Sequence, residues 1–158
     1  MLHVTPSQLQ IIHTQAIQDY PHECCGLLLG SPAGTGARVA EVWPTANAWN
    51  ATVAVELAAG IEALPRSGGP GENFSIAPQD LLQAQKAARD RHLAIIGIYH
   101  SHPDHPAQPS EFDRAIAWPA YYYLILSVCQ GRPGALGCWR LNEQQQFQAE
   151  SLVIQPHA

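Results

Sequence analysis

Charged residues are scarce in this chain. Lysine and arginine number 8, aspartate and glutamate 13, and together they make up 13% of 158 residues. That share is about half of what is usual in globular proteins. The formal net charge is −5, and no basic run is interleaved with aromatic residues. A nucleic-acid phosphate backbone is therefore excluded as the main partner.

Long hydrophobic runs are also lacking. No window approaches about 18 consecutive apolar residues, so the sequence predicts no membrane span. The N-terminus, MLHVTPSQLQII, lacks the basic, apolar and small-residue regions of a signal peptide. The four cysteines form no CxxC motif, which disfavours a thiolate zinc site. We interpret Cys24, Cys25, Cys129 and Cys138 as apolar core residues in a reducing compartment and expect a cytoplasmic protein.

Helices and strands are predicted to interleave within a single domain, residues 1–158. Thr5, Pro6 and Gln8 form a helix start with a capping box, and Pro21 ends that helix. Further helices are predicted at 53–64, 78–91 and from 110 to near 119, and strands at 24–29, 38–43, 74–76, 94–99, 122–128, 135–140 and 147–154. This order predicts an α/β fold with a mixed β-sheet between helices, in three layers. Residues 49–72 give the least clear secondary-structure pattern in the sequence.

The segment IIGIYHSHPDHPAQPSEFD, residues 95–113, carries two competing metal-site patterns. Residues on a strand at i and i+2 project to one face, so His100 and His102 can converge on one ion. Solvated histidines in a polar loop are the plainer alternative. With Asp113 the pair would form a three-ligand zinc set that leaves one position open for water.

Residues 100–105 also spell HxHxDH, a pattern associated with metallo-β-lactamase-type hydrolases. That fold needs further histidines and an acid downstream, yet only His157 follows His105. The HExxH pattern fails because Gly26 stands where the second histidine is required, and the zinc deaminase signature is absent. We interpret the HxHxDH match as accidental.

Two more residues are candidates for catalysis. Ser110 and Asp113 form a capping box variant, and a helix N-terminus also favours a carboxylate or a developing oxyanion. Glu23 precedes the apolar strand CCGLLL, where a carboxylate is costly without a partner, and it is the leading candidate for a general base. An exposed glutamate at a strand end is the alternative.

Four segments together resemble the JAMM (MPN-plus) metalloprotease family: PHECCGLLLG, PTAN at 44–47, FSI with Pro78, and the histidine segment. The resemblance implies a cytidine-deaminase-like fold, Zn²⁺ on His100, His102 and Asp113, Glu23 as the base for the zinc water and Ser110 at the oxyanion. It also implies cleavage of a peptide or isopeptide bond at the tail of a ubiquitin-like protein.

The compact length resembles that of prokaryotic members that act on ubiquitin-like sulfur-carrier proteins, for example releasing cysteine. The alternative is a catalytically inactive MPN scaffold that binds a partner protein, and a homodimer is left open. Residues 49–72 and the additional His105 depart from the family pattern, and their roles are not defined by it.

Overall fold

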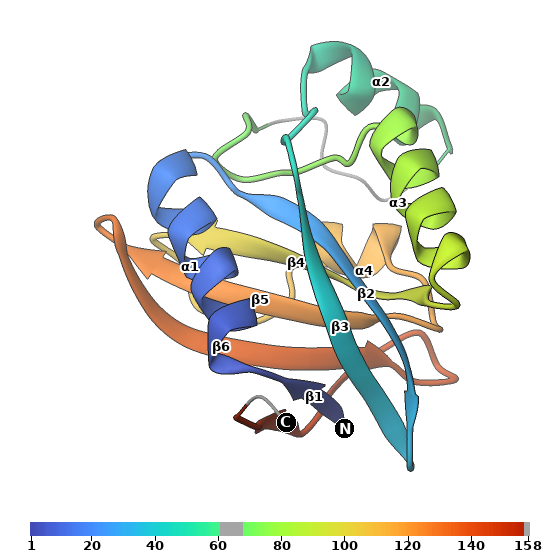
Figure 1. Ribbon diagram of the computed structural model, residues 1–158. Coiled ribbons are helices and arrows are strands. Elements are labelled where there is room, and N and C mark those ends of the chain that lie inside the picture. The colour runs from blue at the N-terminus through green and yellow to red at the C-terminus, as the bar shows by residue number, and fades with distance from the viewer. Residues whose placement is uncertain (61–67, 157–158) are drawn as a thin grey trace.

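The computed structural model describes residues 1–60 and 68–156. Their strands form one eight-stranded mixed sheet in the order β7-β6-β5-β4-β2-β3-β1-β8 (Figure 1). The strands are β1 (Leu2–Val4), β2 (Cys25–Ala33), β3 (Gly36–Thr45), β4 (Ala94–Pro103), β5 (Tyr122–Cys129), β6 (Arg132–Leu141), β7 (Phe147–Ala149) and β8 (Leu152–Ile154). The helices are α1 (Pro6–Asp19), α2 (Ala51–Gly60), α3 (Pro78–Asp90) and α4 (Glu111–Ile116).

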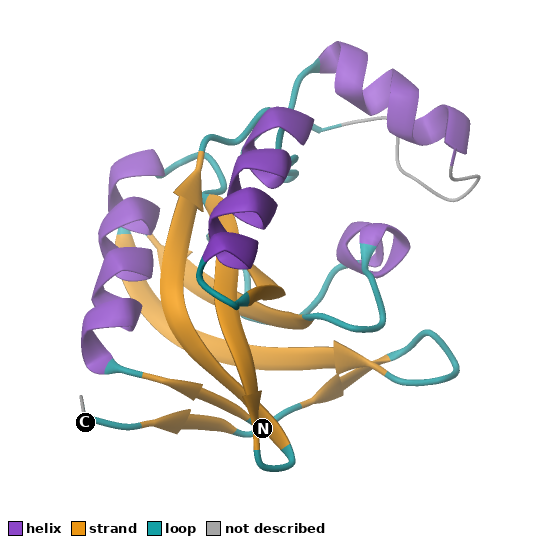
Figure 2. Ribbon diagram, turned by 45° about the vertical axis from the view of Figure 1, so that its right-hand side comes forward, coloured by secondary structure: helices purple, strands orange, loops and turns teal. Residues whose placement is uncertain are grey.

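Helices cover both faces of this sheet (Figure 2). The alternation of side chains along β2 shows how the layers form. Leu28 packs in a buried cluster with Ile12 of α1, whereas Leu27 packs with Ala84 and Ala88 of α3. Helices α2 and α4 add apolar side chains on the α3 side, around Cys25. The predicted three-layer arrangement is confirmed.

The first helix forms as predicted. Thr5 Oγ1 accepts a hydrogen bond from the Gln8 backbone N–H, and the Gln8 side chain accepts one from the Thr5 N–H. Helix α2 begins at Ala51 and is described as far as Gly60, so positions 61–64 of the predicted helix lie outside the described residues. Helix α4 ends at Ile116, earlier than predicted.

Two strand predictions were wrong. Residues 74–76 form no strand, because the Ser75 backbone bonds the segment around Asn47 rather than a neighbouring strand: its N–H donates to Asn47 Oδ1 and its carbonyl accepts from Ala48. The stretch 147–154 is two strands on opposite edges of the sheet, β7 beside β6 and β8 beside β1. Strand β1 was not predicted.

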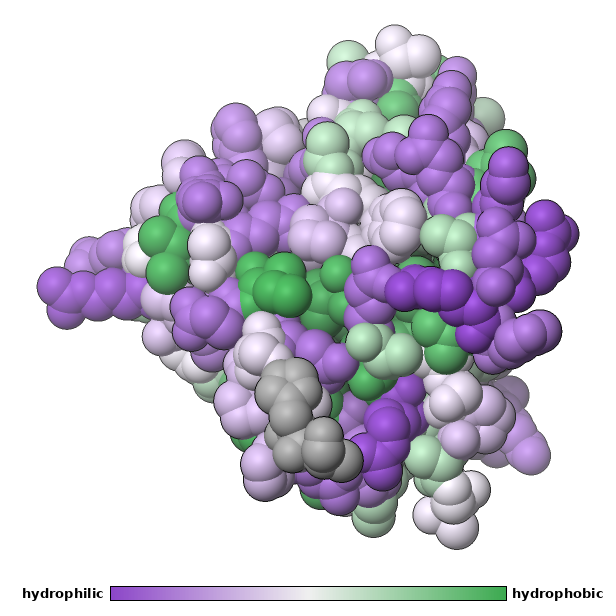
Figure 3. Space-filling view, viewed as in Figure 1, coloured by the Kyte–Doolittle hydropathy of each residue, from purple (hydrophilic) through white to green (hydrophobic). Residues whose placement is uncertain are grey.

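The surface is largely hydrophilic on the face shown in Figure 3, with hydrophobic side chains gathered near its centre. Cysteines Cys24, Cys25 and Cys138 are buried thiols, as predicted, but Cys129 is exposed. Among the described residues, no helix is both long and apolar enough to cross a membrane.

Candidate metal centre

His100 and His102 lie near the C-terminal end of β4, a strand near the middle of the sheet. Strand β4 runs through Pro103, longer than predicted, with β2 on one side and β5 on the other. His100 is directly opposite Cys25 of β2 and Ile125 of β5. Because the two histidines are two residues apart, both rings project to the same face, and both are buried, at 0% and 7% exposed.

Asp113 reaches these rings from the first turn of α4. Its Oδ1 lies 3.1 Å from His100 Nε2 and its Oδ2 lies 3.3 Å from His102 Nε2. The two Nε2 atoms are 3.0 Å apart. Donor atoms bound to one tetrahedral zinc ion are separated by about 3.3 Å, from bond lengths near 2.0–2.1 Å. The three side chains therefore already converge as a group that could hold one metal ion.

The hydrogen bonding of His102 also fits a bound cation. Its Nδ1 lies 2.8 Å from the Pro106 carbonyl oxygen, which can only accept, so Nδ1 carries a proton. In the neutral ring, Nε2 then points a lone pair at an Asp113 oxygen and at His100 Nε2. His102 Nε2 and Asp113 Oδ2 are then two acceptors 3.3 Å apart in a buried site, an arrangement that a proton or a metal ion between them stabilises.

The pKa values reflect this need. Burial acts to raise the pKa of Asp113, but the charge and hydrogen bonds of His100 and His102 outweigh it and hold that pKa well below its usual range. Burial acts to lower the pKa of His102, but Asp113 and the Pro106 carbonyl outweigh it, so the pKa is raised. The carboxylate is thus ionised at neutral pH and available as a ligand.

Glu23 lies beside the same group. Strands β2 and β4 are antiparallel with Cys25 opposite His100, so the residue two before Cys25 comes next to His102. Glu23 is 5% exposed and, among the described residues, its Oε2 has no hydrogen-bond partner. Burial, followed by the charges of Asp113 and Glu72, raises the pKa of Glu23 to about 9. A buried carboxyl with a raised pKa beside a metal centre is typical of catalytic acids and bases.

A cavity of ≈ 370 Å³ connects these groups, lined by Glu23, Glu72, His102, His105 and Ser110 among others. Ser110 forms the predicted capping box with Asp113: its Oγ accepts from the Asp113 N–H at 3.1 Å, and its own N–H donates to Asp113 Oδ2 at 2.7 Å. Because the cap uses only lone pairs of the Ser110 oxygen, its O–H remains free to donate toward this cavity.

Two residues with roles at the centre were not identified as such from the sequence. Phe74 stacks on the His100 ring, with centroids 4.5 Å apart and planes 21° from parallel. Among the described residues His100 Nδ1 has no hydrogen-bond partner, so ring packing, rather than the usual hydrogen bond to the second nitrogen, orients this histidine. Asn47 donates from Nδ2 to the Glu23 carbonyl at 3.1 Å and to the Asn73 carbonyl at 3.0 Å.

The PTAN and FSI segments therefore support the site through the contacts that Asn47 and Phe74 make. Asn47 ties the start of β2 to the chain that carries Phe74, which fixes Glu23 and His100 relative to each other. Neither role was visible from local pattern, because the partners are more than twenty residues apart in the sequence.

The alternative HxHxDH arrangement does not form. Asp104 accepts hydrogen bonds from Tyr20 and from the Gln130 backbone, both at 2.8 Å, and so fixes the turn after β4. His105 is exposed and lines the cavity without joining the converging group. Residues 49–72 are described at 49–60 and 68–72, and the second of these stretches supplies Glu72 to the cavity wall.

A buried His–His–Asp group at the end of a central strand, in a mixed sheet between helices, defines a class of α/β domain with a group that could hold a metal ion. A family model described as prokaryotic homologs of the JAB domain matches residues 5–142. The chain belongs to this family, and the JAMM/MPN resemblance read from its motifs is confirmed.

Similar proteins include a desampylase of Haloferax volcanii, 39% identical over 115 residues that cover 71% of this chain and 67% of that protein. Tail tip assembly protein K of Escherichia phage N15 is 30% identical over 107 residues, 68% of this chain. The alignment spans only 32% of the phage protein's length, about a third.

Solved structures show the same fold. A protein of Desulfitobacterium hafniense superposes with a TM-score of 0.77 at 28% identity, covering 99% of this chain and 94% of that one. A JAB1/MPN domain protein of Archaeoglobus fulgidus gives a TM-score of 0.52 at 19% identity, covering 97% and 96%, and supports the fold alone.

Proposed function

We propose that this protein is a zinc-dependent hydrolase of peptide or isopeptide bonds at the C-terminus of a ubiquitin-like protein. The observation that carries the proposal is the buried convergence of His100, His102 and Asp113, with Glu23 and Ser110 on the adjoining cavity. Nitrogen and oxygen donors in this number suit a catalytic zinc ion with one open position. When bound there, zinc would supply a Lewis acid that acidifies water, and a positive charge that lowers the pKa of Glu23.

Glu23 is assigned the general base. Its carboxylate takes a proton from the attacking water and returns it to the amine that leaves, so one group serves both steps. Its buried position excludes bulk water from the proton transfer, and the Asn47 side chain fixes its backbone. A role as base, rather than as ligand, agrees with its place outside the converging group.

Ser110 is assigned the donor to the oxyanion that develops on the scissile carbonyl. Its oxygen is held by the Asp113 N–H, which fixes the hydroxyl position before substrate arrives. A preorganised donor of this kind acts mainly in the transition state and so raises turnover rather than substrate affinity.

A ubiquitin-like substrate is supported by the Haloferax volcanii relative, whose name, desampylase, describes removal of a protein modifier. The proposed chemistry is amide hydrolysis. A peptide bond and an isopeptide bond to a carrier tail are both amides, so both could be hydrolysed. A ubiquitin-like sulfur carrier that bears a C-terminal adduct such as cysteine is the substrate class that we propose.

The direct test is cleavage of a ubiquitin-like carrier whose C-terminus is joined to the lysine side chain of a peptide. Zinc-loaded protein should release the carrier, and chelation should stop the reaction. Glu23→Gln should keep zinc and bind the conjugate but lose about 100-fold or more in rate, because an amide cannot take the proton. If wild type and Glu23→Gln bind equally and neither cleaves, the hydrolase proposal fails and a partner-binding scaffold replaces it.

A further inference from the structure

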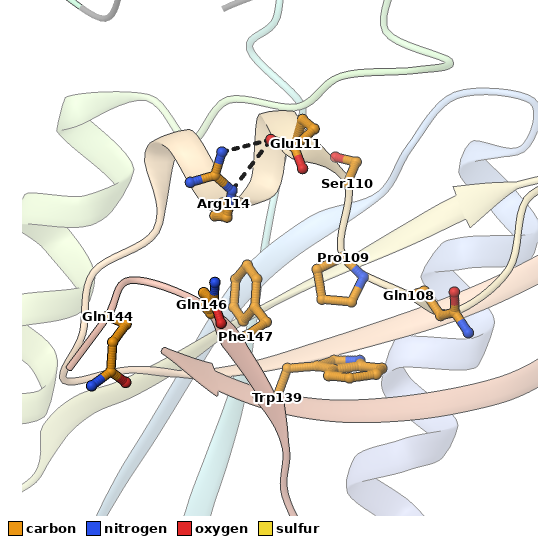
Figure 4. A pocket seen from close by; sticks show the side chains of 9 residues that line it. All are labelled: Gln108, Pro109, Ser110, Glu111, Arg114, Trp139, Gln144, Gln146 and Phe147. Carbon is orange, nitrogen blue, oxygen red and sulfur yellow. Dashed lines mark hydrogen bonds and ion pairs between the residues drawn. The ribbon is translucent and has the colours of Figure 1, made fainter. Parts of the chain in front are cut away.

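A second cavity, of ≈ 610 Å³, adjoins the one beside Glu23. It lies between the segment before α4, the first turn of α4, and the edge of the sheet at β6 and β7 (Figure 4). Gln108, Pro109 and Ser110 line both cavities, so one short segment forms a shared wall. A substrate chain with its scissile bond beside Ser110 would have this second cavity directly next to it, and we call this cavity the Trp139 groove.

The Trp139 groove combines aromatic rings with neutral hydrogen-bonding groups. The half-buried rings of Trp139 and Phe147 lie near Pro109, with Gln108 and Gln144 at the two sides and Gln146 next to Phe147 (Figure 4). Aromatic surface suits the side chains of a peptide, and primary amides suit its backbone N–H and C=O groups.

The groove is preformed. Trp139 Nε1 donates to the Ala107 carbonyl at 3.2 Å, which ties β6 to the segment that carries Ser110. The Phe147 ring packs edge-on against Tyr123, with centroids 5.3 Å apart. On the opposite wall, Arg114 donates to Glu111 Oε2 through both Nε and Nη2, so the cation is already paired. This wall therefore presents a neutralised pair, and a neutral polypeptide segment meets no unpaired charge there.

We propose that the Trp139 groove binds the polypeptide segment of the substrate on the leaving-group side of the scissile bond, with Trp139 as the main contact. This inference rests on the proposed function, which places the scissile bond beside Glu23 and Ser110. Trp139 is then a specificity-determining residue that contributes to substrate affinity. It selects substrates that continue as a protein chain over small amides.

The test measures binding, so that it does not depend on hydrolysis. Three ligands are titrated into zinc-loaded Glu23→Gln protein: a carrier–lysine-peptide conjugate, the carrier alone, and a short amidated peptide of the carrier tail. Adding Trp139→Ala should raise the Kd of the conjugate about 10-fold or more, as for a central aromatic contact. The Kd of the short peptide should stay unchanged.

Two further variants distinguish a direct contact between Trp139 and the ligand from a structural role of Trp139 in supporting the loop. Trp139→Phe keeps a ring but loses the bond to the Ala107 carbonyl, and should bind the conjugate much more tightly than Trp139→Ala. Trp118→Ala removes an exposed tryptophan (67%) outside both cavities and should bind like the parent. If Trp139→Phe is as weak as Trp139→Ala, the side chain only supports the loop and the groove assignment is wrong.

A loss confined to the conjugate assigns the groove to the leaving-group side of the bond. A loss shared with the carrier alone would place the groove on the carrier side of the bond and overturn the proposal. Equal losses for all three ligands, no loss, or no binding of any ligand would overturn the proposal. Wild type that fails to cleave the conjugate, while Trp139→Ala still weakens its binding, would refute the hydrolase and leave the groove standing.

Discussion

Glu23→Gln should change how the stability of the metal-free protein depends on pH. In the fold, burial and the neighbouring charges of Asp113 and Glu72 raise the pKa of Glu23 from 4.5 to about 9. The folded chain therefore holds a proton that the unfolded chain releases at neutral pH. The contribution of this carboxyl is fully present below the unfolded pKa and is lost as pH rises through the folded pKa.

The magnitude follows from the number of protons that differ between the two states. Between the two pKa values that difference approaches one proton, so the free energy of unfolding falls by about 1.4 kcal/mol per pH unit through Glu23 alone. The amide in Glu23→Gln does not titrate. From about pH 6 to pH 8, the wild type should thus lose about 3 kcal/mol relative to the variant.

Urea unfolding in the presence of a chelator, for both proteins at several pH values, measures this difference. All other titratable groups are present in both proteins, so the difference between the two curves reports Glu23 and its coupling to Asp113 and Glu72. Glu143→Gln, which removes an exposed carboxylate, controls for the loss of one charge. Parallel curves for wild type and Glu23→Gln would show that this carboxyl is neither buried nor charge-coupled to the centre, and would refute the reasoning.

Two further substitutions test residues around the centre. Ser110→Ala should lose ~1 kcal/mol of stability in urea unfolding, keep its zinc and fall in kcat on the order of 100-fold, because it removes both a cap and an oxyanion donor; unchanged kcat would leave only the cap. Phe74→Leu should weaken zinc binding on the order of 10-fold in a chelator competition, because the His100 ring loses its support. Leu124→Ala, which creates a cavity in the core on the α1 face, should bind zinc as the wild type does, and equal affinities in the two variants would contradict the role of Phe74.

Local sequence patterns were enough to predict the features whose physics is local. The capping boxes at Thr5 and Ser110 depend on residues three apart, and both form. The convergence of His100 and His102 follows from the two-residue period of a strand. Asp113 could be added because a capping box fixes where the third residue of a helix lies relative to its cap.

Features that depend on long-range pairing could not be predicted in this way. Strand β8 adds to the sheet beside β1, which is almost the whole chain away, and three-residue strands carry too little pattern to identify. The apolar residues on either side of Ser75 resemble a strand pattern. The Ser75 N–H nevertheless donates a hydrogen bond to the Asn47 side chain instead of to a neighbouring strand. The Trp139 groove likewise joins β6, β7 and α4, and only the folded chain brings them together.

X-ray absorption at the zinc K-edge of the zinc-loaded protein tests the central claim most directly, because it reports the atoms bound to the metal. Two imidazole rings and oxygen ligands at about 2.0 Å are expected, from His100, His102, Asp113 and water. The imidazole signal should disappear in the double variant His100→Ala/His102→Ala, together with stoichiometric zinc. A sulfur shell at about 2.3 Å, from any of the four cysteines, would contradict the assignment, as would a full zinc complement in the double variant.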